Sequence, residues 1–63
     1  MLAVLPEDLK NQIYEATLRG RYDFLLKLID QVAAIDLELS ETLRRLIVRF
    51  DYETLLQLFN PGQ

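Results

Sequence analysis

The sequence has no cysteine and no histidine among its 63 residues, and it contains only two glycines and two prolines. The absence of cysteine excludes disulfides, and the absence of both residues excludes the ordinary zinc ligand sets. It also excludes Ser-His-Asp and Cys-His catalytic arrangements, and a phosphotransfer domain that carries its phosphate on histidine. Because Gly20 and Gly62 stand alone, there is no glycine-rich phosphate loop. We therefore expect a protein that is not an enzyme, with no catalytic residue, no metal and no cofactor.

Long apolar runs are missing as well. The longest extends from Leu2 to Pro6, whereas about 20 residues are needed to span a bilayer. The start of the chain lacks the basic region of a signal peptide, and the absence of cysteine is compatible with the cytoplasm. We expect a soluble, cytoplasmic protein without membrane insertion. The sequence leaves open whether Met1 is the natural start.

Size and composition limit how such a chain can be stable. A domain of this length buries only about 60% of the surface that its unfolded chain exposes, and neither a disulfide nor a zinc site can help here. The composition, 51% hydrophobic, favours an unusually apolar helical core, self-association or attachment to a larger protein. The net charge of −3 argues against a nucleic-acid-binding module, whose contact face is normally positive.

Apolar residues recur at helical spacing along the chain, as Leu9, Ile13 and Ala16 do near its start. The pattern predicts an all-α fold in a single domain, a compact unit of four short amphipathic helices that self-associates into a larger bundle. The predicted helices cover residues 6–19, 22–35, 37–50 and 52–59. Because the connections are short, adjacent helices must form hairpins or corners. The stripes predicted to be buried include Ile35 in the second helix and Phe50 in the third.

Individual residues mark the predicted helix ends. Gly20 should close the first helix in the left-handed conformation. Asp36 and Asp51 should cap the third and fourth helices, with Ser40 as a competing cap for the third. The segment Asn60-Pro61-Gly62 should stop the last helix, because proline cannot continue the hydrogen-bond ladder.

The apolar excess predicts an interface. Leu26, Leu37 and Leu58 fall off the main helical stripes and would be partly exposed in a monomer. Contiguous exposed apolar patches usually mark contact surfaces, and a two-fold dimer is the commonest assembly. The full set of predicted interface residues is Phe24, Leu26, Leu37, Leu58 and Phe59.

A basic cluster on the third predicted helix offers a different hypothesis. Arg44, Arg45 and Arg49 could contact an anion or a nucleic acid, as the recognition helix of a helix-turn-helix protein does. The alternative is a solvated face, in which Glu41 pairs with Arg45 four residues later and Asp51 neutralises the cluster further. We favour the solvated face. A small-ligand pocket between the helices is a third possibility, but it would have only apolar walls and tyrosine hydroxyls, so no small-molecule substrate is evident.

Several segments together resemble a short helical tail at the C-terminus of bacterial, especially cyanobacterial, hybrid sensor histidine kinases and response regulators. These segments are Leu5-Pro6-x-x-Leu9, Ala16-x-x-x-Gly20, Leu25-x-x-Leu28-Ile29, Leu43-x-x-Leu46 and Phe50-Asp51-Tyr52-x-x-Leu55-Leu56. The last is the most distinctive. The chain departs from the tail at Arg21, where an acidic residue is usual, and at Asp36 and Leu37, where a proline is common.

The resemblance covers residues 5–59. It implies a tail that follows a receiver domain, carries no known catalytic residue, and mediates dimerisation or docking within a two-component signalling protein. The leading expectation is therefore a non-catalytic interaction module whose partner is a second copy or a signalling domain. The alternative is a nucleic-acid-binding protein that uses its third helix.

Overall fold

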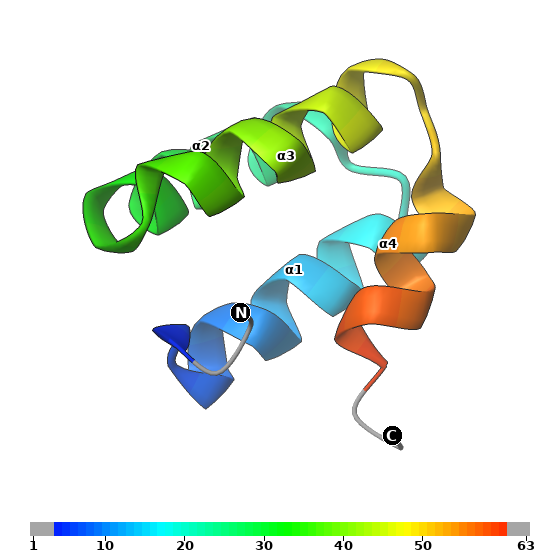
Figure 1. Cartoon of the computed structure of the whole chain (residues 1–63). Coiled ribbons are helices and arrows are strands. Elements are labelled where there is room, and N and C mark those ends of the chain that lie inside the picture. Colours follow the sequence, from blue (N-terminus) through cyan, green and yellow to red (C-terminus); the bar gives the residue numbers. More distant parts are fainter. Residues whose placement is uncertain (1–3, 61–63) are drawn as a thin grey trace.

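The computed structural model describes residues 4–60, which form four helices in a body of 25 × 24 × 16 Å (Figure 1). The helices are α1 (Glu7–Leu18), α2 (Tyr22–Ile35), α3 (Leu37–Val48) and α4 (Tyr52–Phe59). They form two layers, with α2 beside α3 in one and α1 beside α4 in the other, and the layers are joined by α1–α2 and α3–α4 contacts. The predicted all-α fold of four helices is confirmed.

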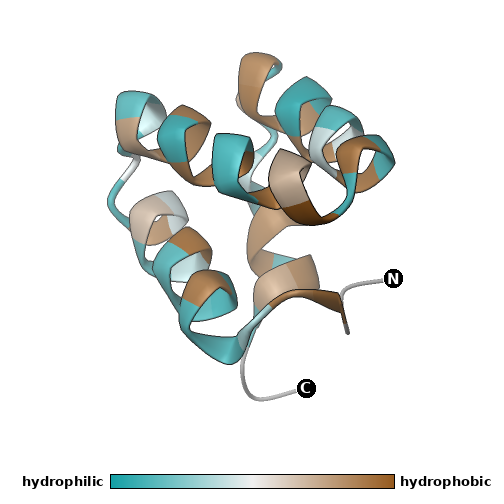
Figure 2. Ribbon diagram, turned by 90° about the vertical axis from the view of Figure 1, so that its left-hand side faces the viewer, coloured by the Kyte–Doolittle hydropathy of each residue, from teal (hydrophilic) through white to brown (hydrophobic). Residues whose placement is uncertain are grey.

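The core lies between these layers and contains side chains from every helix. Leu9 and Ile13 come from α1, and Leu55 and Phe59 come from α4. The remaining large core residues belong to α2 and α3, namely Leu25, Leu28, Ile29, Val32, Leu39, Leu43 and Ile47. Figure 2 shows that hydrophobic and hydrophilic residues alternate along each helix, as expected for helices that bury one face.

The second half of the chain repeats the first after a shift of 30 residues. Helices α1 and α3 are each 12 residues long and start at residues 7 and 37. The segment Arg19-x-x-Tyr22-x-x-Leu25-Leu26-x-Leu28 returns as Arg49-x-x-Tyr52-x-x-Leu55-Leu56-x-Leu58. Each half is therefore a helical hairpin with a similar pattern of leucines, although Leu28 is buried and its equivalent Leu58 is 44% exposed.

The turns inside the two hairpins have the same backbone conformation. Within residues 4–60, positive φ occurs at Gly20 (65°) and at Phe50 (58°), which are equivalent positions of the repeat. In each turn this residue donates its N–H to the carbonyl three residues back, and the next residue donates to the carbonyl five residues back, at 2.9 to 3.1 Å. These bonds satisfy carbonyls that the helix end would otherwise leave without partners. The left-handed closure predicted at Gly20 is confirmed.

Phe50 and Ile35 correct two predictions. The buried stripes were expected to include both, but the side chain of Phe50 is 66% exposed and that of Ile35 is 46% exposed. The third helix ends at Val48 rather than at residue 50, because the left-handed backbone of Phe50 stops it. The predicted helix was thus two residues too long at this end.

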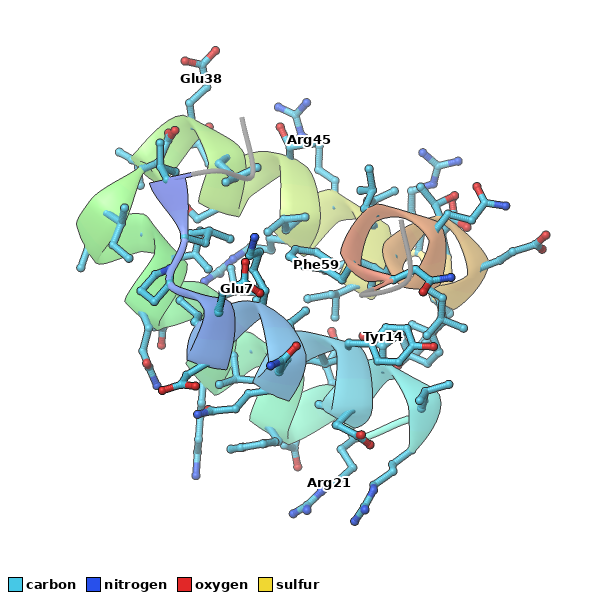
Figure 3. All side chains as sticks on the ribbon, turned by 90° about the horizontal axis from the view of Figure 1, so that it is seen from below. Glu7, Tyr14, Arg21, Glu38, Arg45 and Phe59 are labelled. Atoms are coloured by element: carbon cyan, nitrogen blue, oxygen red, sulfur yellow. The ribbon has the colours of Figure 1, made fainter. Side chains whose placement is uncertain are left out.

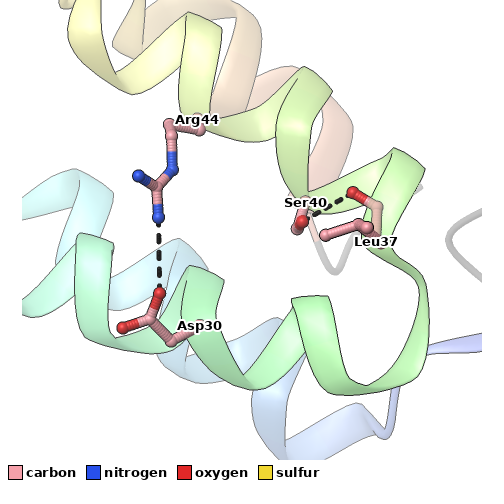
Figure 4. A network of polar contacts seen from close by, with 4 residues as sticks. All are labelled: Asp30, Leu37, Ser40 and Arg44. Carbon is pink, nitrogen blue, oxygen red and sulfur yellow. Dashed lines mark hydrogen bonds and ion pairs between the residues drawn. The ribbon is translucent and has the colours of Figure 1, made fainter.

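The caps of the second hairpin follow the sequence. Asp36 accepts a hydrogen bond from the Leu39 N–H at 3.1 Å, and Asp51 accepts one from the Thr54 N–H at 3.3 Å. Ser40, the competing cap, instead lies buried within α3 and donates to the Leu37 carbonyl at 2.6 Å (Figure 4). Helix α4 ends at Phe59, while residues 61 and 62 of the predicted stop signal lie outside the described residues, as does Met1.

Candidate interaction surfaces

The predicted interface residues occupy different environments. Leu37 is 63% exposed, Leu58 is 44% exposed and Phe24 is 37% exposed, so these three side chains can reach a partner. Leu26 is half-buried against the core, and Phe59 is a core residue, which leaves it little surface for a partner. Leu37 begins α3 at the left of Figure 1, whereas Leu58 belongs to α4 on the right. The structure therefore does not gather the five residues into one patch.

Most of the exposed apolar side chains lie instead at two opposite ends of the molecule. We call the end formed by residues 18–22 and 48–52, at the right of Figure 1, the turn end. We call the end formed by residues 4–8 and 35–38, at the left, the corner end. Leu18, Val48 and Phe50 are exposed at the turn end, and Val4, Ile35 and Leu37 are exposed at the corner end. Of these residues, sequence reasoning had identified only Leu37 as part of an interface.

An aromatic cluster lies at the turn end. The ring of Phe50 lies 5.5 Å from the ring of Tyr22 and 6.1 Å from the ring of Tyr52, measured between centroids. The second pair is edge-on, a favourable arrangement for aromatic rings. Tyr22 and Tyr52 each begin the second helix of their hairpin, so Phe50 joins the two hairpins at this end. The repeated Arg-x-x-Tyr motif is the sequence signal that could have located this cluster.

The two ends differ in charge. Arg19, Arg21 and Arg49 are exposed at the turn end, and Arg21 lies over the Phe24 ring at 5.2 Å. This end also carries acidic residues, but Asp51 already accepts hydrogen bonds from the N–H and the hydroxyl of Thr54. The ion pairs formed within residues 4–60 are Lys10–Glu7 and Arg44–Asp30, so none of the turn-end arginines is in an ion pair with a described residue.

The corner end is acidic. Glu7 and Asp8 lie in the first turn of α1, and Glu38 lies in the first turn of α3. In the view of Figure 3, Glu38 lies at the edge of the molecule opposite Arg21, next to Arg45, and Glu7 lies between the two edges. Glu7 is paired with Lys10 at 2.9 Å, whereas Asp8 and Glu38 are in no ion pair with another described residue. Negative charge at a helix N-terminus is stabilised by the helix dipole.

The basic cluster on α3 is divided by its contacts. Arg44 forms an exposed ion pair with Asp30 of α2 at 3.3 Å (Figure 4). The predicted pair between Glu41 and Arg45 is not among the ion pairs of residues 4–60. An open hollow of about 470 Å³ on α3 is lined by Glu41, Arg44, Arg45, Val48 and Arg49. Its wall includes an acidic residue and a paired arginine, so the lining gives little support for an anion site.

A second hollow lies between α1 and α2. Its volume is about 230 Å³, and its lining includes Ala16, Arg21 and Phe24. Pockets that hold small ligands usually measure about 300 to 1,000 Å³ and bury most of the ligand. This hollow is smaller, so it does not point to a ligand. Across the described part of the chain, no helix is long and apolar enough to cross a membrane.

The fold and surfaces define a small four-helix domain built from two similar hairpins, with exposed apolar residues of contrasting charge surroundings at its two ends. A sequence model of the hybrid histidine kinase-response regulator C-terminal domain matches residues 1–60. The chain belongs to this family, which confirms the resemblance noted from its leucine pattern. No curated protein and no solved structure matches the chain.

Proposed function

We propose that this domain is a non-catalytic interaction module of a two-component signalling protein, acting on the cytoplasmic side and contacting a second copy or another signalling domain. Family membership supports the signalling context. The observation that carries the proposal is the exposure of large apolar side chains, from Phe24 at 37% to Phe50 at 66%. A chain of 63 residues has a small core, which limits its stability. A partner that covers the exposed apolar side chains would stabilise the folded state.

Catalysis has little support in the composition. With neither cysteine nor histidine, the chain lacks the usual nucleophile–base pairs and most general bases. Its carboxylates lie mainly at helix starts, where Asp36 and Asp51 serve as caps. These roles leave no group of residues to which a reaction could be assigned.

A nucleic-acid role for α3 also has little support. Arg44 is paired with Asp30 and Glu41 adjoins the same hollow, so the positive charge is partly neutralised. Binding through phosphates would be strongly salt-dependent. We expect no retardation of duplex DNA by the chain at low salt, and retardation that Arg45→Ala and Arg49→Ala abolish would favour the nucleic-acid role instead.

Sedimentation velocity of the chain from low micromolar to millimolar concentration tests the self-association. We expect the weight-average mass to rise with concentration. Leu58→Glu places a charge on an exposed apolar position, and Gln57→Glu adds the same charge at the neighbouring exposed polar position as the matched control. If α4 contributes to the contact, Leu58→Glu should weaken the association and Gln57→Glu should not.

Docking to a signalling domain is tested by titrating the isotope-labelled chain with a purified receiver domain from a hybrid kinase and following its amide resonances. We expect shifts confined to residues near the exposed apolar side chains. A chain that stays monomeric at millimolar concentration and shows no shift with the receiver domain would overturn the proposed interaction role.

A further inference from the structure

Phe50 has an unusual backbone conformation, with a φ of 58°. A left-handed conformation costs an ordinary residue about 1–2 kcal/mol, whereas glycine adopts it freely. The equivalent turn of the first hairpin has Gly20 at this position, with nearly the same φ and the same hydrogen bonds. The turn itself therefore requires a left-handed residue but no side chain. Phenylalanine at position 50 is strained for a reason that the turn does not supply.

Burial does not supply the reason either. Phe50 is 66% exposed, the highest value among the large apolar residues of the described chain. Its ring contacts Tyr22 and Tyr52 but leaves most of its surface in water. Strained residues concentrate at functional sites, and exposed aromatic side chains are common anchors of protein interfaces. Both observations point to a partner that covers the turn end.

The charge of the turn end selects the kind of partner. Arg19 and Arg49 have no ion-pair partner among the described residues, and Arg21 lies over Phe24. The turn end, residues 18–22 and 48–52, carries three arginines and one aspartate, so a symmetric dimer through two turn ends would bring an excess of positive charge together. Facing like charges would oppose that contact. The partner surface should instead combine apolar side chains with unpaired carboxylates.

Such a surface exists on the chain itself, at the corner end. Leu37 is 63% exposed and Ile35 is 46% exposed there, at the end that also carries Asp8 and Glu38. The corner end lies opposite the turn end across the molecule (Figure 1). One copy can therefore present its corner end to the turn end of the next, with apolar groups facing apolar groups and carboxylates facing arginines.

We propose that this domain self-associates head to tail, the turn end of one copy binding the corner end of the next, with Phe50 as the anchor. The inference rests on the proposed interaction function and specifies its geometry. A contact between two different surfaces leaves a free end on each side, so the assembly grows into open chains or closes into rings. Because each end is small, single contacts are weak, and several copies held near one another would strengthen them.

Charge-reversed variants of the full 63-residue chain test the geometry. Arg49→Glu spoils the turn end and Glu38→Arg spoils the corner end, and each should lower the association constant at least about tenfold. A mixture of the two variants should associate again, because the intact end of each meets the intact end of the other and the two reversed charges attract one another. Sedimentation velocity of each variant alone and of the mixture reads out both results. A mixture that stays monomeric, or variants that associate as the wild type does, would overturn the head-to-tail contact.

Phe50→Gly separates binding from folding. It restores the glycine of the equivalent turn, so the melting temperature should stay the same or rise, while the association constant should fall at least about tenfold. Leu37→Ser tests the opposite end in the same way. A purely structural Phe50 would give the reverse pattern, with a lower melting temperature and unchanged association.

The remaining outcomes distinguish this inference from the proposed function. If Leu58→Glu disperses the assembly and Phe50→Gly does not, the chain is an interaction module with a different interface, and the head-to-tail contact is wrong. If the wild type is monomeric at millimolar concentration but binds a receiver domain through residues around Phe50, the partner is that domain and not a second copy. A mass that stops rising at the dimer and is insensitive to Arg49→Glu would indicate a symmetric dimer, which also overturns the inference.

Discussion

The two hairpins of this domain make the same left-handed turn with different residues. The first hairpin makes its left-handed turn with Gly20, and neither Pro6 nor Arg21 caps its helix with a side chain. The second makes the same turn with Phe50, and both of its helices are capped by aspartates. The first is relaxed at the turn and weakly capped at the helix starts. The second is strained at the turn and well capped, so its caps offset the strain.

This difference shows which positions are shaped by the fold and which are free for another role. The buried pairs Leu9/Leu39 and Leu25/Leu55 and the turn hydrogen bonds are common to both hairpins, so they are what the fold requires. Phe50 departs from its equivalent glycine, is exposed, and is strained. A position with these three properties is where a function separate from folding is expected.

The largest expected effects come from the shared core. Ile13 and Leu43 occupy equivalent positions and are 0% and 1% exposed. Truncating either to alanine should cost about 2–5 kcal/mol, against the roughly 3–5 kcal/mol that a core of this size supplies. We expect Ile13→Ala and Leu43→Ala to unfold the whole chain at room temperature, as measured by circular dichroism and urea titration.

Leu18→Ala, at a position that is 53% exposed, is the control and should leave the transition nearly unchanged. The two core variants also test whether the hairpins are independent. If either variant lost about half of the helical signal and kept a cooperative transition for the rest, the hairpins would fold separately and the single-core description would be wrong.

Gly20→Ala should give the next largest effect. A Cβ at this position meets no atom within 4 Å, so there is no clash and the cost comes from the left-handed backbone alone. We expect a loss of about 1–2 kcal/mol in the free energy of unfolding. Arg19→Ala, one residue earlier and in right-handed conformation, is the matched control. A Gly20→Ala variant as stable as the control would mean that the left-handed turn is not strained, and would weaken the argument made for Phe50.

The caps should contribute somewhat less. Asp36→Ala and Asp51→Ala should each lower stability by about 1 kcal/mol, because the N–H groups of Leu39 and Thr54 lose the carboxylates to which they donate. Asp36→Asn is the control, since asparagine caps as well as aspartate does. Arg21→Asp would give α2 the same N-cap residue that α4 has in Asp51, and it should raise the free energy of unfolding. Thermal unfolding measures all four, and an unchanged midpoint for Asp36→Ala would contradict the role of the cap.

The smallest effect is expected for the ion pair between α2 and α3. The side chains of Arg44 and Asp30 are 56% and 73% exposed, so water screens their attraction. Arg44→Ala should cost only roughly 0.2–1 kcal/mol, and the difference should shrink at high salt. Arg45→Ala is the control, because the Arg45 side chain is in no ion pair with a described residue. A loss of stability well above this range would mean that the ion pair holds the two hairpins in position.

Local patterns were sufficient to predict most of the helical framework. The helices α2 and α4 have the predicted bounds, while α1 is shorter by one residue at each end and α3 ends two residues early. Gly20, Asp36 and Asp51 act where their local chemistry placed them, because turns and caps depend on residues only a few positions apart. The core leucines were likewise visible in the spacing.

Phe50 and Ile35 show where that reasoning stopped. Their positions continue the helical period, yet both lie where a helix ends and the chain turns away from the core. Periodicity predicts which face of a helix is buried, but it does not predict the residue at which the helix ends and the chain leaves the core. Phe59, predicted both for the buried face of the last helix and for the interface, lies in the core.

The sequence by itself determined the secondary structure, the family and the lack of the usual catalytic and zinc-binding residues, because composition and short-range spacing carry that information. Only the tertiary structure decided which apolar residues share an end of the molecule. Tyr22 and Phe50 meet across 28 positions of sequence because the hairpins fold side by side, and Ile35 and Leu37 share an end with Val4 only because α2 folds back along α1. Such groupings depend on how the helices cross, a property that no local spacing records.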